Sequence, residues 1–267
     1  MTAVRLATKY VEKPWGRTSL PPVFPDGGRR IGELWFDGPE GQHPPLLVKY
    51  IFTSERLSIQ VHPDDAQARA RGLPGGKNEC WFILDAEPGA TLGMGTLKPL
   101  DDEALRAASL NGQIERLMDW KPAKAGDFFY IPAGTVHAIG AGVTLVEVQQ
   151  NVDVTYRLYD YGRPRELHLD EGVSVSRAEP YAWAPVNLTD AHAAALLGRD
   201  EAPFTLRLET LPEGEHDLGG DVPLWFVPLS GRGTVENEPW AGGQCWLVTG
   251  ETRLSVTEVS RALIASL

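Results

Sequence analysis

The sequence predicts a mainly β protein of the sandwich or barrel kind, with short helical insertions. Segments in which apolar and polar residues alternate recur along the chain, bounded by Gly or Pro. The 267 residues include 28 Gly and 21 Pro, a content that suits many short strands joined by turns. Alternation with a period of two is typical of half-buried strands, because successive side chains point to opposite faces of a sheet.

Strands are expected in six alternating segments of the first part of the chain. They are RIGELWFDG (30–38), LLVKYIFTS (46–54), RLSIQVHPDD (56–65), ECWFILDAEPGATLGMG (79–95), GDFFYIPAGTVHAIG (126–140) and VTLVEVQQNVDVTYRLYDYG (143–162). The last segment alternates from Thr144 to Tyr159, which is too long for one ordinary strand. A bend is therefore expected within it.

Two helical insertions are expected between these strands. Residues 98–120 begin with Pro99 and two Asp, and their apolar residues then recur at roughly helical spacing, namely Leu105, Leu110, Ile114 and Leu117. This pattern predicts one helix or a helix pair. A second, short helix is predicted from Asp64 to Gly72, with acidic residues at its N-terminal end.

The remainder of the chain predicts a connector followed by a second, smaller β unit. The alternation weakens after residue 172, and the segment that follows carries Pro180, Pro185 and Pro203. Alternating segments then return in FTLRLETL, VPLWFVPL and TRLSVTEVSRALIAS. We expect a first domain at residues 1–165, and a connector with a smaller β domain at residues 166–267.

Composition excludes several classes of function. The formal net charge of −11 argues against a surface that binds nucleic acid or an anionic membrane, because both need many Lys and Arg side chains. No apolar run approaches the length of a membrane span, and no signal-like segment begins the chain, so a cytoplasmic location is expected. Cys80 and Cys245 lack metal-site or disulfide spacing, and both are expected to be reduced and buried.

The segment from Arg56 to His62 places polar side chains on one face of an expected strand. Ser58, Gln60 and His62 point one way, whereas the aliphatic residues between them point the other way. Residues two apart on a strand have Cα atoms about 6.5 to 7 Å apart, so two of these side chains can reach one ion. A polar face turned to water would give the same alternation and stays an alternative.

Two further segments supply partners for this face. Lys77 and Glu79 share a face of the next expected strand, and His137 follows a Pro-Ala-Gly turn. Gln60, His62, Glu79 and His137 form a nitrogen and oxygen ligand set that suits zinc, and iron, cobalt and manganese are also compatible. Taken singly, Glu79 could be a solvated strand residue and His137 a hydrogen-bonded histidine near a turn.

Six motifs between Lys13 and Arg163 carry a resemblance to a known family. In order they are KPWG, GELW, LSIQVHPDD, GKNECWFIL, IPAGTVHAIG and QQNVDVTYRLYDYGR. Together they closely resemble the type I mannose-6-phosphate isomerases in their short bacterial form, a zinc-dependent family built on the cupin jelly-roll barrel. The resemblance implies that fold for the first unit, with a degenerate cupin-like second unit.

The resemblance also implies roles for nine residues. One zinc ion per chain would be held by Gln60, His62, Glu79 and His137. Lys49 and Ser58 would bind the substrate phosphate. Arg157 would be an active-site cation, and Lys77 and Asp153 would act in proton transfer or substrate contact. Either Lys77 or Asp153 could be the base.

The implied reaction is the interconversion of D-mannose 6-phosphate and D-fructose 6-phosphate through an enediol. The partner would be a small phosphosugar, and the protein a monomer or homodimer. The segment Val152-Asp153-Val154-Thr155 departs from the usual Ser-Asp-x-Thr of the family, which leaves open a sugar-binding or regulatory cupin without turnover. Another metal-dependent cupin enzyme, such as an oxygenase or a different sugar isomerase, is a further alternative.

Overall fold

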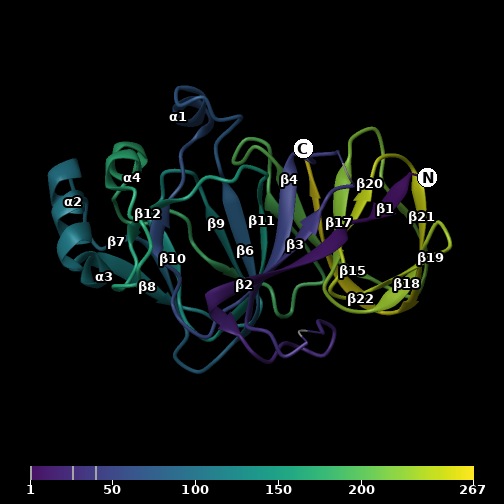
Figure 1. Cartoon of the computed structure of the whole chain (residues 1–267). Coiled ribbons are helices and arrows are strands. Elements are labelled where there is room, and N and C mark those ends of the chain that lie inside the picture. The colour runs from purple at the N-terminus through teal and green to yellow at the C-terminus, as the bar shows by residue number, and fades with distance from the viewer. Residues whose placement is uncertain (1, 26, 40) are drawn as a thin grey trace.

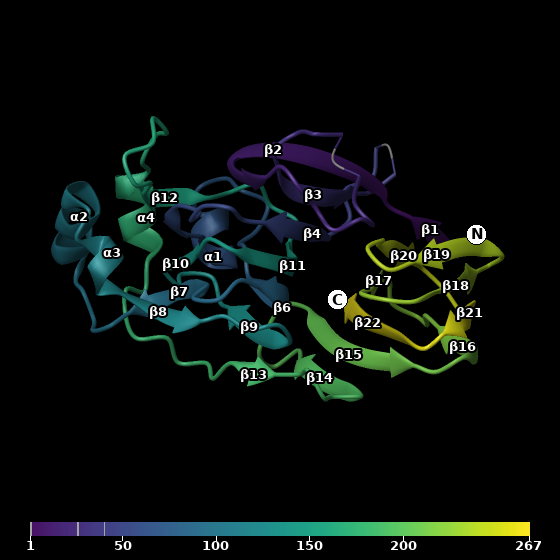
Figure 2. The same cartoon turned by 90° about the horizontal axis from the view of Figure 1, so that it is seen from below.

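Four antiparallel sheets are stacked along the long axis of the molecule in the computed structural model, which describes residues 2–25, 27–39 and 41–267. From one end to the other, the layers are a group of helices, a five-stranded sheet, a seven-stranded sheet, a six-stranded sheet and a four-stranded sheet (Figure 1). The view from below shows the same succession, with α2 and α3 at one end and β18 and β21 at the other (Figure 2). The predicted mainly β architecture with helical insertions is confirmed.

The seven-stranded sheet lies at the centre of this stack. In spatial order it consists of β13 (Val186–Asn187), β9 (Asp127–Ile131), β6 (Glu79–Ala86), β11 (Val143–Gln150), β4 (Leu46–Phe52), β3 (Ile31–Asp37) and β2 (Ala7–Arg17). The sequence alternates along its strands, so each strand has two different faces. On β4, Val48 and Tyr50 pack toward the C-terminal sheets, whereas Lys49 and Ile51 point the opposite way.

The five-stranded sheet faces the other side of the central sheet. Its spatial order is β12 (Tyr156–Tyr159), β5 (Ile59–Val61), β10 (His137–Ile139), β7 (Thr91–Thr96) and β8 (Met118–Pro122). Trp81, Ile83, Leu92 and Ile139 belong to the core that lies between the two sheets. The expected bend after β11 is confirmed, because β11 and β12 belong to different sheets.

Helices cover the outer face of the five-stranded sheet. They are α2 (Asp102–Asn111), α3 (Ile114–Leu117) and α4 (Leu169–Val175), while α1 (Asp65–Arg69) follows β5. The expected helical insertion at residues 98–120 is confirmed and consists of two helices: Asp101 caps α2 by accepting from the backbone of Ala104, and Gly112 ends it with φ of 76°. Ile59 and Val61 of β5 pack against these helices, so Gln60 between them points inward.

The last two sheets form the smaller β unit. The six-stranded sheet consists of β1 (Ala3–Arg5), β20 (Trp246–Val248), β17 (Leu224–Pro228), β22 (Ser260–Ser266), β15 (Thr205–Leu211) and β14 (Ala193–Leu197). The four-stranded sheet consists of β16 (Gly214–Leu218), β21 (Thr252–Glu258), β18 (Arg232–Val235) and β19 (Glu238–Ala241). A separate apolar core lies between them, in which Phe226 and Trp240 meet edge to face.

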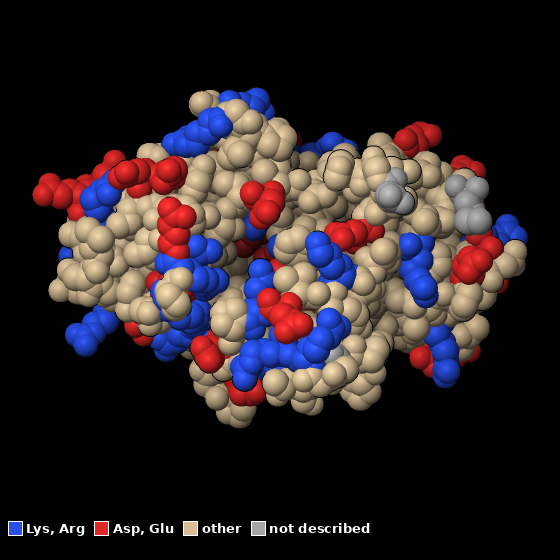
Figure 3. Space-filling view, viewed as in Figure 1, with Lys and Arg blue, Asp and Glu red and all other residues tan. Residues whose placement is uncertain are grey.

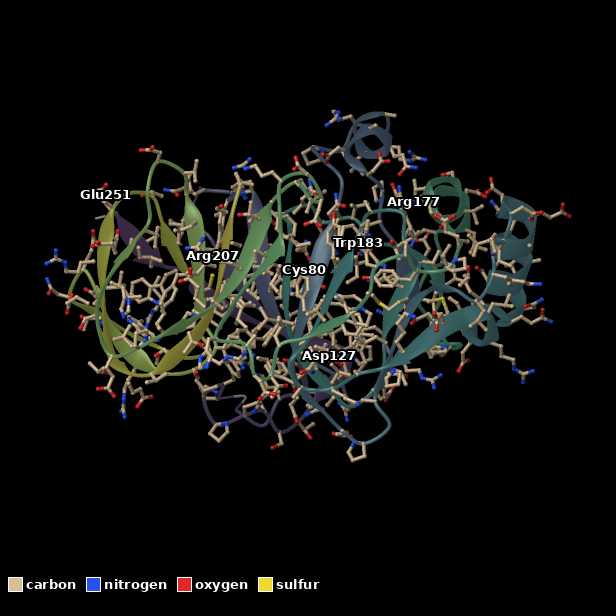
Figure 4. All side chains as sticks on the ribbon, turned by 180° about the vertical axis from the view of Figure 1, so that it is seen from behind. Cys80, Asp127, Arg177, Trp183, Arg207 and Glu251 are labelled. Atoms are coloured by element: carbon tan, nitrogen blue, oxygen red, sulfur yellow. The ribbon has the colours of Figure 1, made fainter. Side chains whose placement is uncertain are left out.

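One large core joins the central sheet to the six-stranded sheet. Val48 and Tyr50 of β4 share it with Trp225 and Leu263 of the smaller unit. Cys80 and Cys245 are both free and buried in this core, as expected, and Figure 4 shows Cys80 near the middle of the molecule. The face of the central sheet that packs on the smaller unit is therefore apolar, and its opposite face is available for a functional site.

Two pairings cross the expected boundary at residue 165. β1, from the start of the chain, pairs with β20, and β13, from the connector, pairs with β9. Trp183 of the connector meets Tyr130 of β9 with ring centroids 5.0 Å apart, on the face seen in Figure 4. The division into residues 1–165 and 166–267 stays a prediction. Within the part of the chain that the structure describes, no helix is long and apolar enough to cross a bilayer.

Candidate metal centre and adjoining pocket

Three predicted ligands meet between the five-stranded and the central sheets. His62 directly follows β5, Glu79 begins β6 and His137 begins β10. Each side chain is about 1% exposed, and one potential ligand atom from each lies within 4.8 Å of the others. Segments 75 residues apart in sequence thus place two imidazoles and one carboxylate around one point.

Two of the three side chains in this cluster have polar atoms without ordinary hydrogen-bond partners among the described residues. Both ring nitrogens of His62 and both carboxylate oxygens of Glu79 are buried and unsatisfied. Nε2 of His62 lies 3.4 Å from Glu79 Oε2, and Nε2 of His137 lies 3.3 Å from Glu79 Oε1. Buried polar atoms nearly always have a partner, so a group of unsatisfied donor atoms at one point fits a bound cation.

The backbone orients His137 toward the cluster. Its Nδ1 lies 2.8 Å from the carbonyl oxygen of Thr135, a contact in which Nδ1–H donates. Such a bond leaves Nε2 unprotonated and directed at the common point, which is how ligating histidines are usually held. The Pro-Ala-Gly turn before β10 therefore helps to orient His137, because it places the Thr135 carbonyl within hydrogen-bond distance of Nδ1.

Gln60 lies beside this cluster on β5. It is the strand partner of His137, and its side-chain nitrogen is 3.3 Å from His137 Nε2. Its side-chain oxygen accepts a hydrogen bond of 3.1 Å from the Ser58 hydroxyl. Rotating the side-chain amide of Gln60 by half a turn would present its oxygen, instead of its nitrogen, to the cluster. The role of Gln60 as a fourth ligand stays a prediction.

Burial sets the protonation state of the three clustered side chains. Burial lowers the pKa of His62 to about 3, and it also lowers the pKa of His137. Burial alone would raise the pKa of Glu79, but His62 and Lys77 outweigh it, so this pKa lies far below its usual range. Two neutral imidazoles and one carboxylate are the forms that bind a divalent metal.

A pocket of about 380 Å³ adjoins the cluster, with Gln60 and Lys77 in its wall. It lies between the five-stranded sheet and the face of the central sheet that carries Lys49. Figure 3 shows Lys and Arg side chains gathered around a hollow on the face of the molecule seen in Figure 1. All six other predicted site residues line this pocket: Lys49, Ser58, Gln60, Lys77, Asp153 and Arg157. The structure thus brings every predicted site residue to one place.

Lys49 is buried deep in the wall and is already paired. Its ammonium lies 2.9 Å from Glu147 Oε1 and donates to the side-chain oxygen of Gln149 at 2.5 Å. Glu147 also accepts from the indole nitrogen of Trp81 at 3.1 Å. Burial lowers the pKa of Lys49, but Glu147 and Glu33 outweigh it, so its pKa lies above the usual range. Lys49 is therefore a charged, well-compensated group.

Lys77 lies between the pocket and the metal cluster. Its ammonium is 3.6 Å from Glu79 Oε2, and the side chain is 8% exposed. Burial, followed by the nearby charge of Lys49, lowers the pKa of Lys77 below its usual range. By contrast, Asp153 is exposed in the segment between β11 and β12.

Arg157 is placed by the pairing of β12 with β5. It is the strand partner of Gln60, so its side chain emerges on the same face beside the cluster. One terminal nitrogen donates to the carbonyl of Glu166 at 2.6 Å. Its Nε is buried without a partner among the described residues.

Several pocket residues were not predicted as site residues. Among them are Lys13, Glu33, Trp35, Glu147, Gln149 and Arg165. Glu147 and Gln149 could have been found from alternation, because they share a face with Asp153 in the long alternating segment. Glu33 and Trp35 likewise alternate within GELW, and their side chains contact each other through the indole nitrogen.

Comparisons with known proteins show which proteins the chain is similar to. No family model matches the chain. The mannose-6-phosphate isomerase of Streptococcus mutans is 42% identical over 204 residues, which are 72% of this chain and 62% of that protein. The enzyme ManA of Bacillus subtilis, also named mannose-6-phosphate isomerase, is 41% identical over 161 residues, 55% of this chain and 51% of that protein. The chain thus matches less than two thirds of the length of these relatives.

Solved structures extend the likeness over the whole chain. The crystal structure of mannose 6-phosphate isomerase from Bacillus subtilis superposes with a TM-score of 0.80 at 25% identity, covering 100% of both chains. The chain is similar to mannose-6-phosphate isomerases in sequence and in fold. A zinc-bound mannose 6-phosphate isomerase has a TM-score of 0.71 at 16% identity, covering 100% of this chain and 99% of that one, and supports the fold. The resemblance to mannose-6-phosphate isomerases and the cupin fold are both confirmed.

Proposed function

We propose that the protein is a metal-dependent aldose-ketose isomerase that interconverts D-mannose 6-phosphate and D-fructose 6-phosphate through an enediol. The observation that carries this proposal is the buried cluster of His62, Glu79 and His137 beside a pocket rich in cations, in which the polar atoms of His62 and Glu79 are unsatisfied. The similarity to proteins named mannose-6-phosphate isomerase supports the choice of substrate.

The metal is proposed to be zinc, one ion per chain. His62, Glu79 and His137, with Gln60 as the fourth ligand, would hold it, and two imidazoles with a carboxylate and an amide oxygen suit zinc. Iron, cobalt and manganese accept the same donors, so the donor set alone does not select one metal. When bound, zinc supplies Lewis acidity that makes the proton next to the substrate carbonyl easier to remove.

Lys77 is the favoured base for moving the proton between C2 and C1. Its ammonium lies beside Glu79 and its side chain lines the pocket, so it can reach a sugar bound next to the cluster. Asp153 is the alternative base, but its exposed place in the loop is less suited to proton transfer that must exclude water. Asp153 would then contact substrate hydroxyl groups.

Arg157 is proposed to stabilise the negative charge that develops on the sugar oxygens. It is adjacent to Gln60 across the strand pair, and its Nε has no partner among the described residues. A fixed cation in a site that excludes water contributes more to such stabilisation than it would in solvent.

Lys49 and Ser58 are proposed to contact the substrate phosphate. They lie on β4 and just before β5, and both line the pocket. Because Lys49 is paired with Glu147 and Gln149, the phosphate would have to share its ammonium with these groups. A large rise in KM for the phosphosugar in Lys49→Ala would support the contact, and unchanged kinetics would remove it.

The proposed setting is the cytoplasm, with the protein acting as a monomer or homodimer on a small phosphosugar and without nucleic-acid or membrane partners. The net charge of −11 is consistent with this, because nucleic-acid and anionic-membrane partners need many Lys and Arg side chains. Size-exclusion chromatography with light scattering would decide between monomer and dimer.

The deciding experiment measures the formation of fructose 6-phosphate from mannose 6-phosphate by purified protein, before and after chelation and zinc replacement. Loss on chelation and recovery with zinc would support the isomerase. His216→Ala is a suitable control, because His216 lies on β16, far from the cluster in the fold. No turnover in fully zinc-loaded protein would contradict the proposal and favour a binding protein.

A further inference from the structure

A rigid turn follows β12 at the edge of the pocket. Asp160, whose side chain is 2% exposed, accepts hydrogen bonds from Arg165 Nε and Arg165 Nη2, each 2.6 Å long. It also pairs with Arg163 at 3.1 Å. A buried carboxylate that holds a guanidinium in two parallel bonds fixes the plane as well as the position of that group.

The backbone of this turn is also constrained. Tyr161 has a φ of 55°, which is uncommon for a residue with a side chain and is found mostly where surrounding contacts impose it. The amide of Arg163 donates to the Asp160 carbonyl at 3.0 Å, and that of Arg165 donates to the Arg163 carbonyl at 2.8 Å. Pro164 limits the remaining freedom between these bonds. Arg165 is therefore presented in one fixed orientation.

Arg165 lines the same pocket as Arg157. The pair with Asp160 uses Nε and one terminal nitrogen, which leaves its other terminal nitrogen available for a ligand. The side chain remains 28% exposed, so a molecule in the pocket can reach it.

Two cations at this end of the pocket repel each other. Burial, followed by the charge of Arg165, lowers the pKa of Arg157. Among the residues that the structure describes, Arg157 forms no ion pair with a carboxylate, and its Nε is unsatisfied. Negative charge on a bound substrate would relieve this repulsion, and a phosphate oxygen at Arg165 would accept from its free terminal nitrogen.

The other cations of the pocket are already paired with carboxylates. Lys13 lies 3.4 Å from Glu33, Lys49 lies 2.9 Å from Glu147, and Lys77 lies 3.6 Å from Glu79. Among the described residues, Arg157 is therefore the cation of the pocket without a carboxylate partner, and the carboxylate of its neighbour Arg165, Asp160, is shared with Arg163.

We propose that Arg165 is a specificity-determining residue that binds the phosphate group of the substrate on the side of the pocket that holds Ser58, and that Asp160 is its positioning residue. This inference rests on the proposed isomerase function. Ser58 is near the same end, because Ile59 is the strand partner of Tyr159, directly before Asp160. The sugar would then extend from the metal cluster, beside Gln60, toward the turn.

The first test compares the steady-state kinetics of wild type and Arg165→Gln with mannose 6-phosphate. We expect KM to rise about tenfold to a hundredfold, the usual effect of losing a charge-assisted bond, while kcat changes less than about threefold. Arg165→Lys keeps the positive charge but lacks the planar guanidinium group, so its KM should lie between those of wild type and Arg165→Gln. Asp160→Asn should shift KM in the same direction as Arg165→Gln, with a smaller effect.

Arg163→Gln is the matched control. Arg163 contacts the same carboxylate, but it donates to the backbone of Arg56 and does not line the pocket. Its KM should equal that of wild type. An equal rise of KM in Arg163→Gln and Arg165→Gln would overturn the proposal, since it would reflect loss of the turn. A fall in kcat at constant KM in Arg165→Gln would overturn it as well.

A second test uses inorganic phosphate and does not depend on turnover. Titration calorimetry of the zinc-loaded protein should detect phosphate binding that is at least about tenfold weaker in Arg165→Gln than in wild type and Arg163→Gln. If wild type binds phosphate in this way but does not isomerise mannose 6-phosphate, the proposed reaction fails and the arginine site stands. Equal phosphate affinity in wild type and Arg165→Gln would overturn the arginine site.

Discussion

Nε2 of His137 lies 3.3 Å from Oε1 of Glu79, although the two residues belong to strands of different sheets. Neither sheet alone contains the cluster, because β6 of the central sheet supplies the carboxylate while the segments of β5 and β10 supply the imidazoles. Packing of the two sheets and formation of the metal site are therefore coupled. A metal bound there would link the two sheets in the folded state.

The first prediction is that Glu79→Gln loses its metal. The substitution keeps the size of the side chain but removes the negative charge that faces both imidazoles. We expect zinc affinity to fall at least about a hundredfold, since even residues outside the ligand set change it by 10 to 100-fold. Metal content after dialysis against a weak chelator measures this. Glu238→Gln, an exposed change on β19, should retain the wild-type metal content.

Much of this site could be predicted from local pattern. Alternation along β5 and β6 placed Gln60, His62 and Glu79 on inward faces, and the structure confirms that their neighbours Ile59 and Cys80 point into apolar cores. Such predictions succeed because the face of a strand residue depends only on the period of the backbone. Helix at α2 and α3 was predictable from the helical spacing of apolar residues and the two Asp near its start, although the sequence left open whether it forms one helix or two.

Other features depend on contacts between distant segments and were out of reach. The expected strand from Arg56 to His62 is reduced to Ile59–Val61, because only these residues find ladder partners. The role of Asp160 in holding Arg165 depends on a turn conformation with positive φ at Tyr161, which tertiary contacts impose. Leu110 fits helical spacing, yet it is 65% exposed, since spacing alone does not reveal which turn of α2 is covered.

The second prediction concerns the dependence of stability on pH through Glu33. Burial would raise its pKa, but Lys49 and Lys13 outweigh burial, so the pKa of Glu33 lies below its usual value in the folded protein. A carboxyl with a depressed pKa stabilises the fold above the unfolded-state value of about 4.3, and this contribution is lost as pH falls through the folded-state value.

Denaturant unfolding of wild type and Glu33→Gln between pH 7 and pH 3 tests this relation. The difference in the free energy of unfolding should be largest near neutral pH and should shrink below about pH 4.3. Glu238→Gln serves again as the exposed control and should show little difference at any pH. A constant difference between wild type and Glu33→Gln over the whole range would contradict the prediction.

The third prediction is that Glu147→Gln destabilises the protein through Lys49. The two side chains are only 5% and 9% exposed, and their ion pair spans 2.9 Å. Removing one partner of a buried pair leaves an uncompensated charge and costs about 3 to 5 kcal/mol. We expect a loss near the lower end, because Gln149 still accepts from Lys49. Urea unfolding measures the change.

A double variant separates this charge effect from a general packing defect. Lys49→Met in the Glu147→Gln background removes the uncompensated ammonium, so part of the lost stability should return. If the double variant is less stable than Glu147→Gln by the full effect of Lys49→Met alone, the two residues do not interact and the prediction is wrong.

The fourth prediction assigns the base by comparing Lys77→Ala with Asp153→Asn. Both variants should retain zinc, because neither side chain belongs to the cluster of His62, Glu79 and His137. Lys77 is buried beside that cluster, whereas Asp153 is exposed, so kcat should fall about 10² to 10⁴-fold in Lys77→Ala and much less in Asp153→Asn. Turnover of mannose 6-phosphate and zinc content are measured on the same samples.

A larger loss of kcat in Asp153→Asn, with zinc retained in both variants, would transfer the role of base to Asp153. Loss of zinc from Lys77→Ala would instead assign Lys77 to holding Glu79 in place, since its ammonium lies 3.6 Å from that carboxylate.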